Sequence, residues 1–206
     1  MRKKSHISLA RYLANNMQVQ ELNDHRKAFY LGSILPDLKP SFLTKRHTID
    51  ETFEDLIEVI KKITVEYDIT RGIDRNYARH LGVITHYLSD YCTFPHNSIF
   101  KGNIKEHVLY EKELKISLRK YLLREDTQRP RQFNQQFSSF EEIITYIKKT
   151  HKNYLNALKE VHIDIKFIVE LCYKVVEAVL IFFEKALGKL ENELIYKYRV
   201  RTQFSL

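Results

Sequence analysis

Five side chains of the kinds that bind metal ions lie close together in the middle of the chain. His86 and Asp90 are four residues apart, as are His107 and Glu111, and His96 follows a proline between the two pairs. Residues four apart project from the same face of an α-helix, because one turn takes about 3.6 residues. Each pair therefore places two candidate ligands on one face of a predicted helix, and the stretch predicts a metal centre.

Three more candidate ligands lie upstream: His6, Asp37 and His47. Zinc prefers imidazole nitrogen and carboxylate oxygen at about 2.0–2.2 Å, and neutral histidines combined with ionised carboxylates nearly cancel the charge of the ion. A carboxylate can also bridge two ions. The whole set is sufficient for two or three zinc ions if water fills some coordination positions.

The order of the motifs that carry these residues resembles the zinc-dependent phospholipase C family, which shares its fold and metal cluster with the S1/P1 nucleases. The motifs are "SHISLA" with His6, "GSILPD" with Asp37, "KRH" with His47, "HYLSDYCTFPH" from His86 to His96, and "EHVLYEKEL" with His107 and Glu111. His-x3-Asp alone is common by chance, whereas the ordered combination is far more specific. The ligand series falls within residues 1–123.

The resemblance implies how the ligands divide between the ions. One zinc is held by Asp37, His47, His86 and Asp90, and a second by His96, His107 and Glu111. Asp90 bridges to a third, which His6 holds together with the amine and carbonyl of a processed N-terminal residue in the secreted relatives. This chain departs from that pattern because no cleaved leader is visible that would expose a new amine at a fixed place, although Met1 lies only five residues before His6. We therefore expect two zinc ions, with the third dependent on the N-terminus.

The resemblance also implies an activity, which is hydrolysis of a phosphodiester by a metal-activated water. Paired zinc ions lower the pKa of a bound water and neutralise charge on a phosphoryl oxygen. Asp37 is the candidate proton acceptor, and no covalent intermediate is expected. The predicted substrate is a phospholipid or a related phosphodiester. An S1/P1-type nuclease or nucleotidase is the alternative, although we find no aromatic platform for base stacking. A non-catalytic zinc-binding protein is the third reading.

Each ligand also has a simpler interpretation, which is salt-bridged pairs on helix surfaces. The three candidate ligands upstream, His6, Asp37 and His47, argue against this interpretation. His80 lies six residues before His86, so it points away from the face of the helix that carries His86 and Asp90. We expect it to be a surface or half-buried residue. His25, His151 and His162 have polar or charged neighbours and are expected at the surface. Two cysteines, Cys92 and Cys172, lie in apolar helical stretches, where small buried thiols are expected.

The composition predicts an all-α, single-domain bundle of about seven helices over residues 1–206. The chain has 44% hydrophobic residues, only five glycines and four prolines, and little strict alternation of apolar residues. Helices are expected from Ser5 as N-cap to Asn16, from Asp24 to Ser33, from a Thr48–Glu51 capping box to Tyr67, from Asp74 to Pro95, from Ile104 to Leu123, from a Ser139–Glu142 capping box to Val161, and from Asp164 to Gly188. The helices within residues 139–188 are expected to pack against the ligand-bearing ones. Residues 124–136 are polar and predict a loop or lid.

Charge and hydropathy suggest where the protein acts. The formal net charge of +8 fits an anionic substrate or surface, and Arg2, Lys3 and Lys4 are candidates for contact with lipid headgroups. The longest apolar stretch, residues 167–183, contains three charged residues and is too polar for a transmembrane segment. No apolar core of a signal peptide is visible, so we expect a cytoplasmic protein. Leu38 follows Asp37 where an aromatic residue would favour choline, so a choline preference is not predicted.

Overall fold

The computed structural model describes residues 1–38, 46–128, 131, 137 and 139–203, with side chains described as far as residue 196. Within this part all regular elements are helices, which confirms the all-α prediction. The α-helices are α1 (Lys3–Met17), α2 (Gln20–Asp24), α3 (Arg26–Gly32), α4 (Ile49–Lys62), α5 (Arg75–Tyr91), α6 (Ile104–Leu122), α7 (Phe140–Leu155) and α8 (Val161–Gln203), with short 3₁₀ turns η1 (Pro36–Leu38), η3 (Ile69–Arg71), η4 (Phe94–His96) and η5 (Glu125–Thr127).

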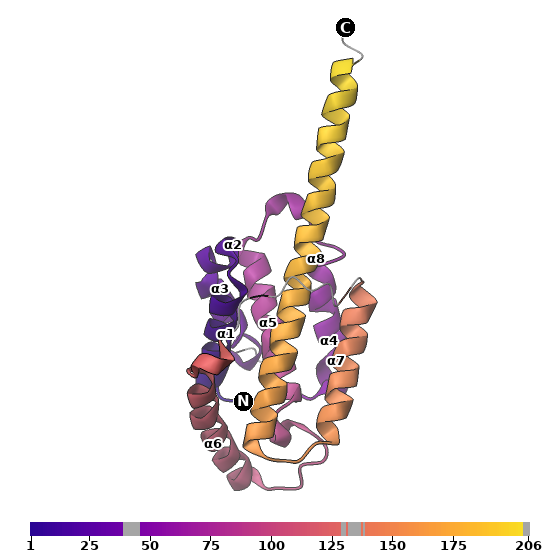
Figure 1. Cartoon of the computed structure of the whole chain (residues 1–206). Helices are drawn as coiled ribbons and strands as arrows, with labels where there is room; N and C mark the ends of the chain where they lie inside the picture. Colours follow the sequence, from indigo (N-terminus) through magenta and orange to yellow (C-terminus); the bar gives the residue numbers. More distant parts are fainter. Residues whose placement is uncertain (39–45, 129–130, 132–136, 138, 204–206) are drawn as a thin grey trace.

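Helices α5 and α8 form the centre of the bundle. Helix α5 contacts α1, α3, α4 and α8, while α8 contacts α1, α5, α6 and α7 (Figure 1). Fully buried residues such as Leu81 and Leu88 on α5 and Val176 and Leu180 on α8 belong to one core. The apolar residues recur every three or four positions along both helices, as a helix that buries one face requires. The metal-ligand pair of α5 is therefore carried by one of the most enclosed helices of the molecule.

Helices α3 and α5 approach each other closely through two glycines. A Cβ atom on Gly32 would lie 2.0 Å from the carbonyl oxygen of Arg79, and one on Gly82 would lie 2.2 Å from the carbonyl oxygen of Phe29. Only residues without a side chain allow this backbone contact. The contact brings the end of α3, and η1 beyond it, against the part of α5 that carries the ligands.

Side-chain caps fix the start of α5 and α6, the two helices that carry the i,i+4 ligand pairs. The Asp74 carboxylate accepts a hydrogen bond from the Tyr77 amide and caps α5. At α6, Asn103 and Glu106 form a reciprocal capping box. The Asn-x-x-Glu spacing is a known signal for this motif. The predicted beginnings of both helices are therefore confirmed.

Two predicted caps are wrong. Helix α1 begins at Lys3 rather than after Ser5, since the Arg2 carbonyl accepts from the Ser5 amide and leaves Ser5 inside the first turn. Thr48 is the N-cap of α4 but makes no side-chain cap, since the Glu51 amide donates to the Thr48 carbonyl, and the Glu51 carboxylate accepts from the Arg46 amide. In both places a neighbouring backbone group takes the role that the pattern assigned to a side chain.

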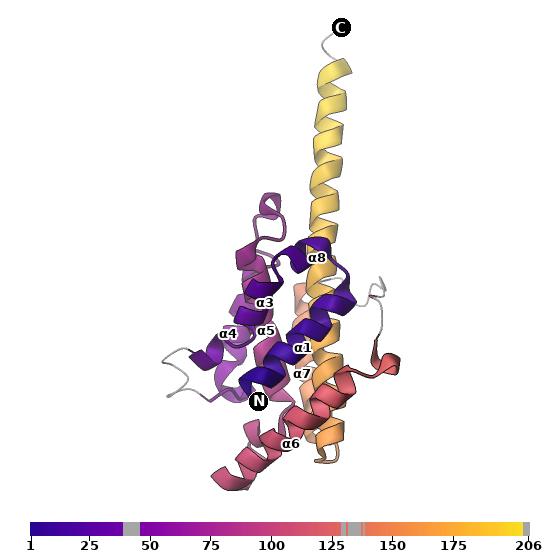
Figure 2. The ribbon, with the colours of Figure 1, turned by 90° about the vertical axis from the view of Figure 1, so that its left-hand side faces the viewer.

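Several predicted helix ends also differ from the structure. The helix expected from Asp24 to Ser33 corresponds to α3, and a separate short helix that was not predicted, α2, precedes it and ends next to His25. Helix α4 ends at Lys62 and α7 at Leu155, both earlier than predicted. Helix α8 begins slightly before the predicted Asp164 and continues past Gly188 to Gln203, and its far end projects alone beyond the bundle (Figures 1 and 2). Of the predicted loop or lid, residues 129–130 and 132–136 lie outside the described part.

The described helices include none with both the length and the apolar content needed to cross a bilayer. Cys92 and Cys172 are free and buried, as predicted for small packing thiols. Burial raises the pKa of both thiols. Neither cysteine belongs to the groups of residues that could hold a metal ion in the described part of the chain.

Candidate metal centre

The structure brings all eight predicted ligands together at one end of the bundle. They come from α1 (His6), η1 (Asp37), the residue before the N-cap of α4 (His47), α5 (His86 and Asp90), η4 (His96) and α6 (His107 and Glu111). Their nitrogen and oxygen atoms form three groups, His6/Asp37/His86, His47/His86/Asp90 and His96/His107/Glu111, with the atoms of each group within 4.8 Å of one another. Segments distant in sequence thus converge on one polar centre.

The first ligand set consists of Asp37, His47, His86 and Asp90. The Nδ1 atom of His47 lies 2.9 Å from Nε2 of His86, 3.3 Å from Asp90 Oδ2 and 3.5 Å from Asp37 Oδ1. The Nε2 atom of His86 lies 3.3 Å from Asp90 Oδ2 and 3.7 Å from Asp37 Oδ1. Tetrahedral zinc with ligands at about 2.0–2.2 Å requires ligand atoms about 3.3–3.6 Å apart. Four of these five distances lie within about 0.1 Å of that range and the distance between the two imidazoles is shorter, so the four side chains are close to the arrangement of a zinc site.

The second ligand set consists of His96, His107 and Glu111. The Oε1 atom of Glu111 lies 3.5 Å from His107 Nε2 and 3.9 Å from His96 Nε2. His107 and Glu111 are one turn apart on α6, as the i,i+4 spacing predicts. Three protein ligands leave a coordination position for water or substrate, which is typical of catalytic zinc and not of structural zinc.

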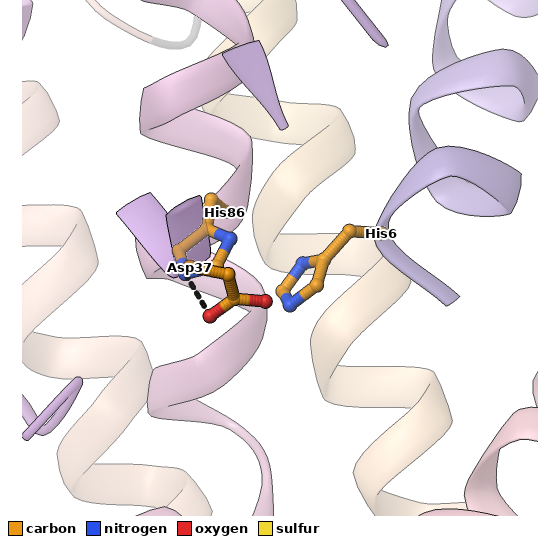
Figure 3. Close-up of side chains that lie close together, drawn as sticks. All are labelled: His6, Asp37 and His86. Carbon is orange, nitrogen blue, oxygen red and sulfur yellow. Dashed lines mark ion pairs between the residues drawn. The ribbon is translucent and has the colours of Figure 1, made fainter. Parts of the chain in front are cut away.

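His6 faces His86 across the centre with its ring stacked at 4.1 Å between centroids, and Asp37 lies beside them (Figure 3). The Ser89 hydroxyl donates to the His86 carbonyl and lies 3.1 Å from His6 Nδ1, so it accepts from that ring nitrogen. The other nitrogen, Nε2, then carries a lone pair, and it is buried without a hydrogen-bond partner. A buried acceptor of this kind costs free energy unless a ligand uses it. The arrangement fits a metal ion.

His86 is oriented by the backbone at the end of α3. Its Nδ1 atom lies 2.9 Å from the Ser33 carbonyl oxygen, which can only accept, so Nδ1 carries the proton. The lone pair of Nε2 is left facing the other ligands. Metal-bound histidines usually donate their second ring nitrogen in this way. The close contact at Gly32 and Gly82 is what brings this carbonyl within reach.

Asp90 is the common neighbour of the groups. Its Oδ1 atom lies 2.6 Å from the amino group of Met1 and 3.4 Å from His6 Nε2, while its Oδ2 atom faces His47, His86 and His96. Burial opposes ionisation of this carboxyl, but the Met1 amino group and the imidazoles outweigh it and hold the pKa of Asp90 well below its usual range. Asp90 is thus an ionised carboxylate at a position from which it can bridge neighbouring cations.

The amino group of Met1 lies inside the centre. Besides Asp90, it is 3.3 Å from His96 Nε2 and 3.6 Å from Glu111 Oε1. Burial opposes its charged form, yet the two carboxylates raise its pKa. It therefore lies next to the position at which the family resemblance implies an N-terminal amine.

Asp37 differs from Asp90 in its surroundings. Burial, followed by the negative charge of Asp90, raises the pKa of Asp37 to about 6. For His86, burial lowers the pKa to about 4, so the ring is neutral at physiological pH, as a metal ligand must be. Asp37 also lines a cleft of about 1360 Å³, together with His47, His96 and Glu111, so the centre is open to a substrate.

Two buried polar side chains from outside the ligand-bearing elements hold η4 in place. The Asp164 carboxylate of α8 accepts from the Phe94 amide at 3.1 Å and from the Tyr110 hydroxyl. On α7, Nε2 of His151 lies 2.9 Å from Oδ1 of Asn97, the residue after His96. The prediction that His151 is a surface residue is therefore wrong, because it is buried between α7 and this turn.

The other histidines stay outside the centre. His80 is half-buried and its Nδ1 atom lies 2.8 Å from the carbonyl oxygen of Asn76, one turn earlier on α5. His25 is half-buried and His162 is exposed. Neither belongs to a candidate metal group within the described residues.

Comparison with known families gives a match to the model "Zinc dependent phospholipase C" over residues 5–161. The chain belongs to the zinc-dependent phospholipase C family. The match includes all eight predicted ligands and extends through α7, beyond the ligand series itself. Comparison with curated proteins and with solved structures finds no match. Membership of this family and the clusters of histidine and carboxylate support a zinc-dependent, phosphodiesterase-like role.

Proposed function

We propose that the protein is a zinc-dependent phosphodiester hydrolase of the phospholipase C type, acting on a phospholipid. The observation that carries the proposal is the geometry of the two ligand sets. The first has four ligand atoms close to the spacing of tetrahedral zinc, and the second has three beside an open cleft. An incomplete set facing a cleft is not needed for a structural ion, which argues against a non-catalytic role.

The first set would hold one zinc and the second another, with Asp90 between them. Zinc bound there supplies an activated water at neutral pH and offsets the charge that builds on a phosphoryl oxygen. The half-buried Asp37 borders the cleft and is the proposed acceptor of the proton released from the attacking water. The buried rings of His6 and His86 are held by Ser89 and Ser33, so they keep their orientation during the reaction.

Cationic side chains at the mouth of the cleft would bind the anionic substrate. Arg2, Lys3, Lys4 and Lys115 line the cleft next to the second set. Arg2 is fixed there, since its Nη2 atom donates to the Val108 carbonyl and its Nε atom lies 3.8 Å from Glu111. These cationic side chains favour phosphate oxygens.

The test is hydrolysis by the purified, zinc-loaded protein. Phosphatidylcholine, phosphatidylinositol, phosphatidylglycerol, single-stranded DNA and a chromogenic phosphodiester are each incubated with the protein, with and without a chelator. We expect release of diacylglycerol that the chelator abolishes. Release of 5′-nucleotides in place of diacylglycerol would identify a nuclease, and retained zinc without turnover on any substrate would identify a binding protein.

A matched pair of variants tests the role of Asp37. Asp37→Asn keeps the size of the side chain but removes the proton acceptor, so turnover is expected to fall at least about a hundredfold. Asp50→Asn makes the same chemical change at another residue that lines the cleft. It should leave the zinc content unchanged and alter turnover only slightly. Equal activity of the two variants would refute the assigned role.

A further inference from the structure

The outer face of α6 combines exposed apolar and basic side chains. Its large apolar residues Ile104, Val108, Leu109 and Ile116 are all between 46% and 84% exposed. The basic residues of the same face are Lys105, Lys112, Lys115, Arg119 and Lys120. Most surface helices of a folded domain expose polar residues and bury their apolar ones. On α6 a second apolar group therefore faces solvent, in addition to the buried Leu114, Leu118 and Leu122.

These nine residues form one continuous sector of the helix. With about 100° of rotation per residue, they fall within a sector of about 160°, in which no acidic residue occurs. The three glutamates of α6 lie outside it: Glu106 in the capping box, Glu111 in the second ligand set and Glu113 at the edge. Within the described part of the chain, no carboxylate pairs with the five cations of the sector.

Helix α1 extends the basic surface. Helices α1 and α6 lie against each other (Figure 2), and a groove of about 570 Å³ between them is lined by Lys4 and Arg11 of α1 and by Lys115, Arg119 and Lys120 of α6. Its other lining residues are Ile7, Ser8 and Ile116. Lys4 and Lys115 also line the cleft at the metal centre. The groove and the cleft are therefore neighbours on one basic surface.

We propose that the outer face of α6, with the groove beside α1, docks the protein on an anionic phospholipid surface. The proposal rests on the proposed function, for which it provides the approach to the substrate. Each Lys or Arg near an anionic bilayer adds to the attraction, and the interleaved apolar residues enter the headgroup boundary. Because Ile104 and Lys115 belong to both the face and the cleft, docking brings the metal centre to the lipid headgroups.

The apolar residues distinguish a bilayer from a nucleic acid. A phosphate backbone is bound by Lys and Arg, and the bases of a single strand stack on aromatic rings. The exposed large residues of this face are aliphatic: Ile104, Val108, Leu109 and Ile116. Aliphatic side chains gain free energy in the acyl region and gain little from a base. A lipid surface is therefore the occupant that the face fits.

The test measures co-sedimentation of the zinc-loaded full chain with vesicles, a readout that does not require hydrolysis. We expect binding to vesicles of phosphatidylcholine mixed with phosphatidylglycerol, weakened by high salt, and little binding to phosphatidylcholine alone. Lys112→Glu combined with Arg119→Glu should weaken binding at least about tenfold. Lys149→Glu combined with Lys152→Glu reverses two exposed charges on α7 and should leave binding unchanged.

A second pair of variants, Leu109→Ser with Ile116→Ser, keeps every charge of the face. It should weaken vesicle binding severalfold and leave binding to a single-stranded oligonucleotide unchanged. The proposal is overturned if the wild type does not bind anionic vesicles, if the α6 and α7 charge reversals act equally, or if the serine pair has no effect. Lost vesicle binding with retained hydrolysis of a soluble phosphodiester refutes docking alone, whereas vesicle binding without any hydrolysis refutes the proposed function alone.

Discussion

The bundle has a half that carries the candidate metal ligands, α1 to α6, and a half that carries none of them, α7 and α8. Each half contains a buried aspartate, and the two aspartates have opposite surroundings. Asp90 on α5 faces imidazole nitrogens of four histidines and the Met1 amino group, and its pKa lies far below the usual value. Asp164 on α8 accepts from a backbone amide and a tyrosine hydroxyl, and burial raises its pKa. The first environment, with the charged Met1 amino group and several imidazole nitrogens, favours an ionised carboxylate, whereas the second holds a carboxyl among neutral donors.

Asp90 and Asp164 illustrate two roles of buried polar residues: metal binding, and support of a turn that carries a metal ligand. Helices α7 and α8 contribute no ligand in the described part of the chain, and most of their buried side chains are aliphatic. Even so, Asp164 and His151 each reach η4, the turn that carries His96. Asp90 therefore belongs to the candidate metal centre itself, whereas Asp164 and His151 support the turn that positions a ligand. The two roles predict different responses to substitution.

Asp90→Ala is expected to have the largest effect. It removes the one carboxylate that touches both ligand sets, so zinc content and hydrolysis should both fall, the latter by at least about a thousandfold. Zinc per chain is measured by elemental analysis, and turnover with a chromogenic phosphodiester. Asp50→Ala, at the rim of the cleft, is the control and should retain its zinc. Wild-type zinc content in Asp90→Ala would show that the two sets do not share this residue.

Removal of zinc should affect the two halves unequally. The ligands pull together α1, η1, α5, η4 and α6, and binding that favours the folded state stabilises it in proportion to RT ln(1 + [L]/Kd). A chelator should therefore lower Tm and increase hydrogen exchange at the end of α5, in η4 and at the start of α6. The segment of α8 around Val175 and Leu180 lies in the aliphatic core and should stay protected longer. Uniform loss of protection would show that the halves unfold as one.

Asp164→Ala should cost about 2–3 kcal/mol, because it leaves the Phe94 amide and the Tyr110 hydroxyl without a buried acceptor. Tyr110 and Phe94 adjoin Glu111 and the η4 turn, so the second ligand set should also loosen. Denaturant unfolding gives the free energy, and competition with a chromogenic chelator gives the zinc affinity. Asp126→Ala breaks an exposed pair with Arg124 and should leave the free energy of unfolding nearly unchanged.

Asp164 also predicts a pH dependence of stability. A carboxyl whose pKa is raised by folding contributes stability below its unfolded pKa, and that contribution is lost as the pH rises through the folded value. The difference in stability between wild type and Asp164→Asn should therefore shift in favour of the variant as the pH increases above 4 to neutrality, about the range in which a raised Asp titrates. A constant difference across this range would mean that Asp164 ionises normally.

The ligands could be predicted from the sequence because their signal is local. The i,i+4 spacing of His86 with Asp90 and of His107 with Glu111 survives folding unchanged, since each pair is carried by one helix. Helix starts with a side-chain cap, at Asp74 and Asn103, are local as well. These features depend on residues within one turn of each other, which a single sequence displays directly.

The supporting contacts could not be predicted, since they join segments far apart in the chain. His151 has charged neighbours in sequence and looks like a surface residue, yet it meets Asn97, 54 positions away. The Ser33 carbonyl that orients His86 is a backbone group and leaves no trace in residue type. Gly82 gave a local signal of the close helix contact, because it is a glycine inside a helix, four residues before a ligand.

His80→Ala should have the smallest effect and tests whether position, and not residue type, defines the centre. His80 lies on the same helix as His86 and Asp90, but its ring nitrogen lies against the Asn76 carbonyl and its side chain is half-buried away from the ligands. Alanine is the best helix former, so the lost hydrogen bond is largely offset and the change in stability should be within about 0.5 kcal/mol. Zinc content and turnover should match the wild type. His86→Ala, at the ligand position of the same helix, should lose zinc under the same conditions, and similar losses in both variants would mean that α5 binds metal through a different face.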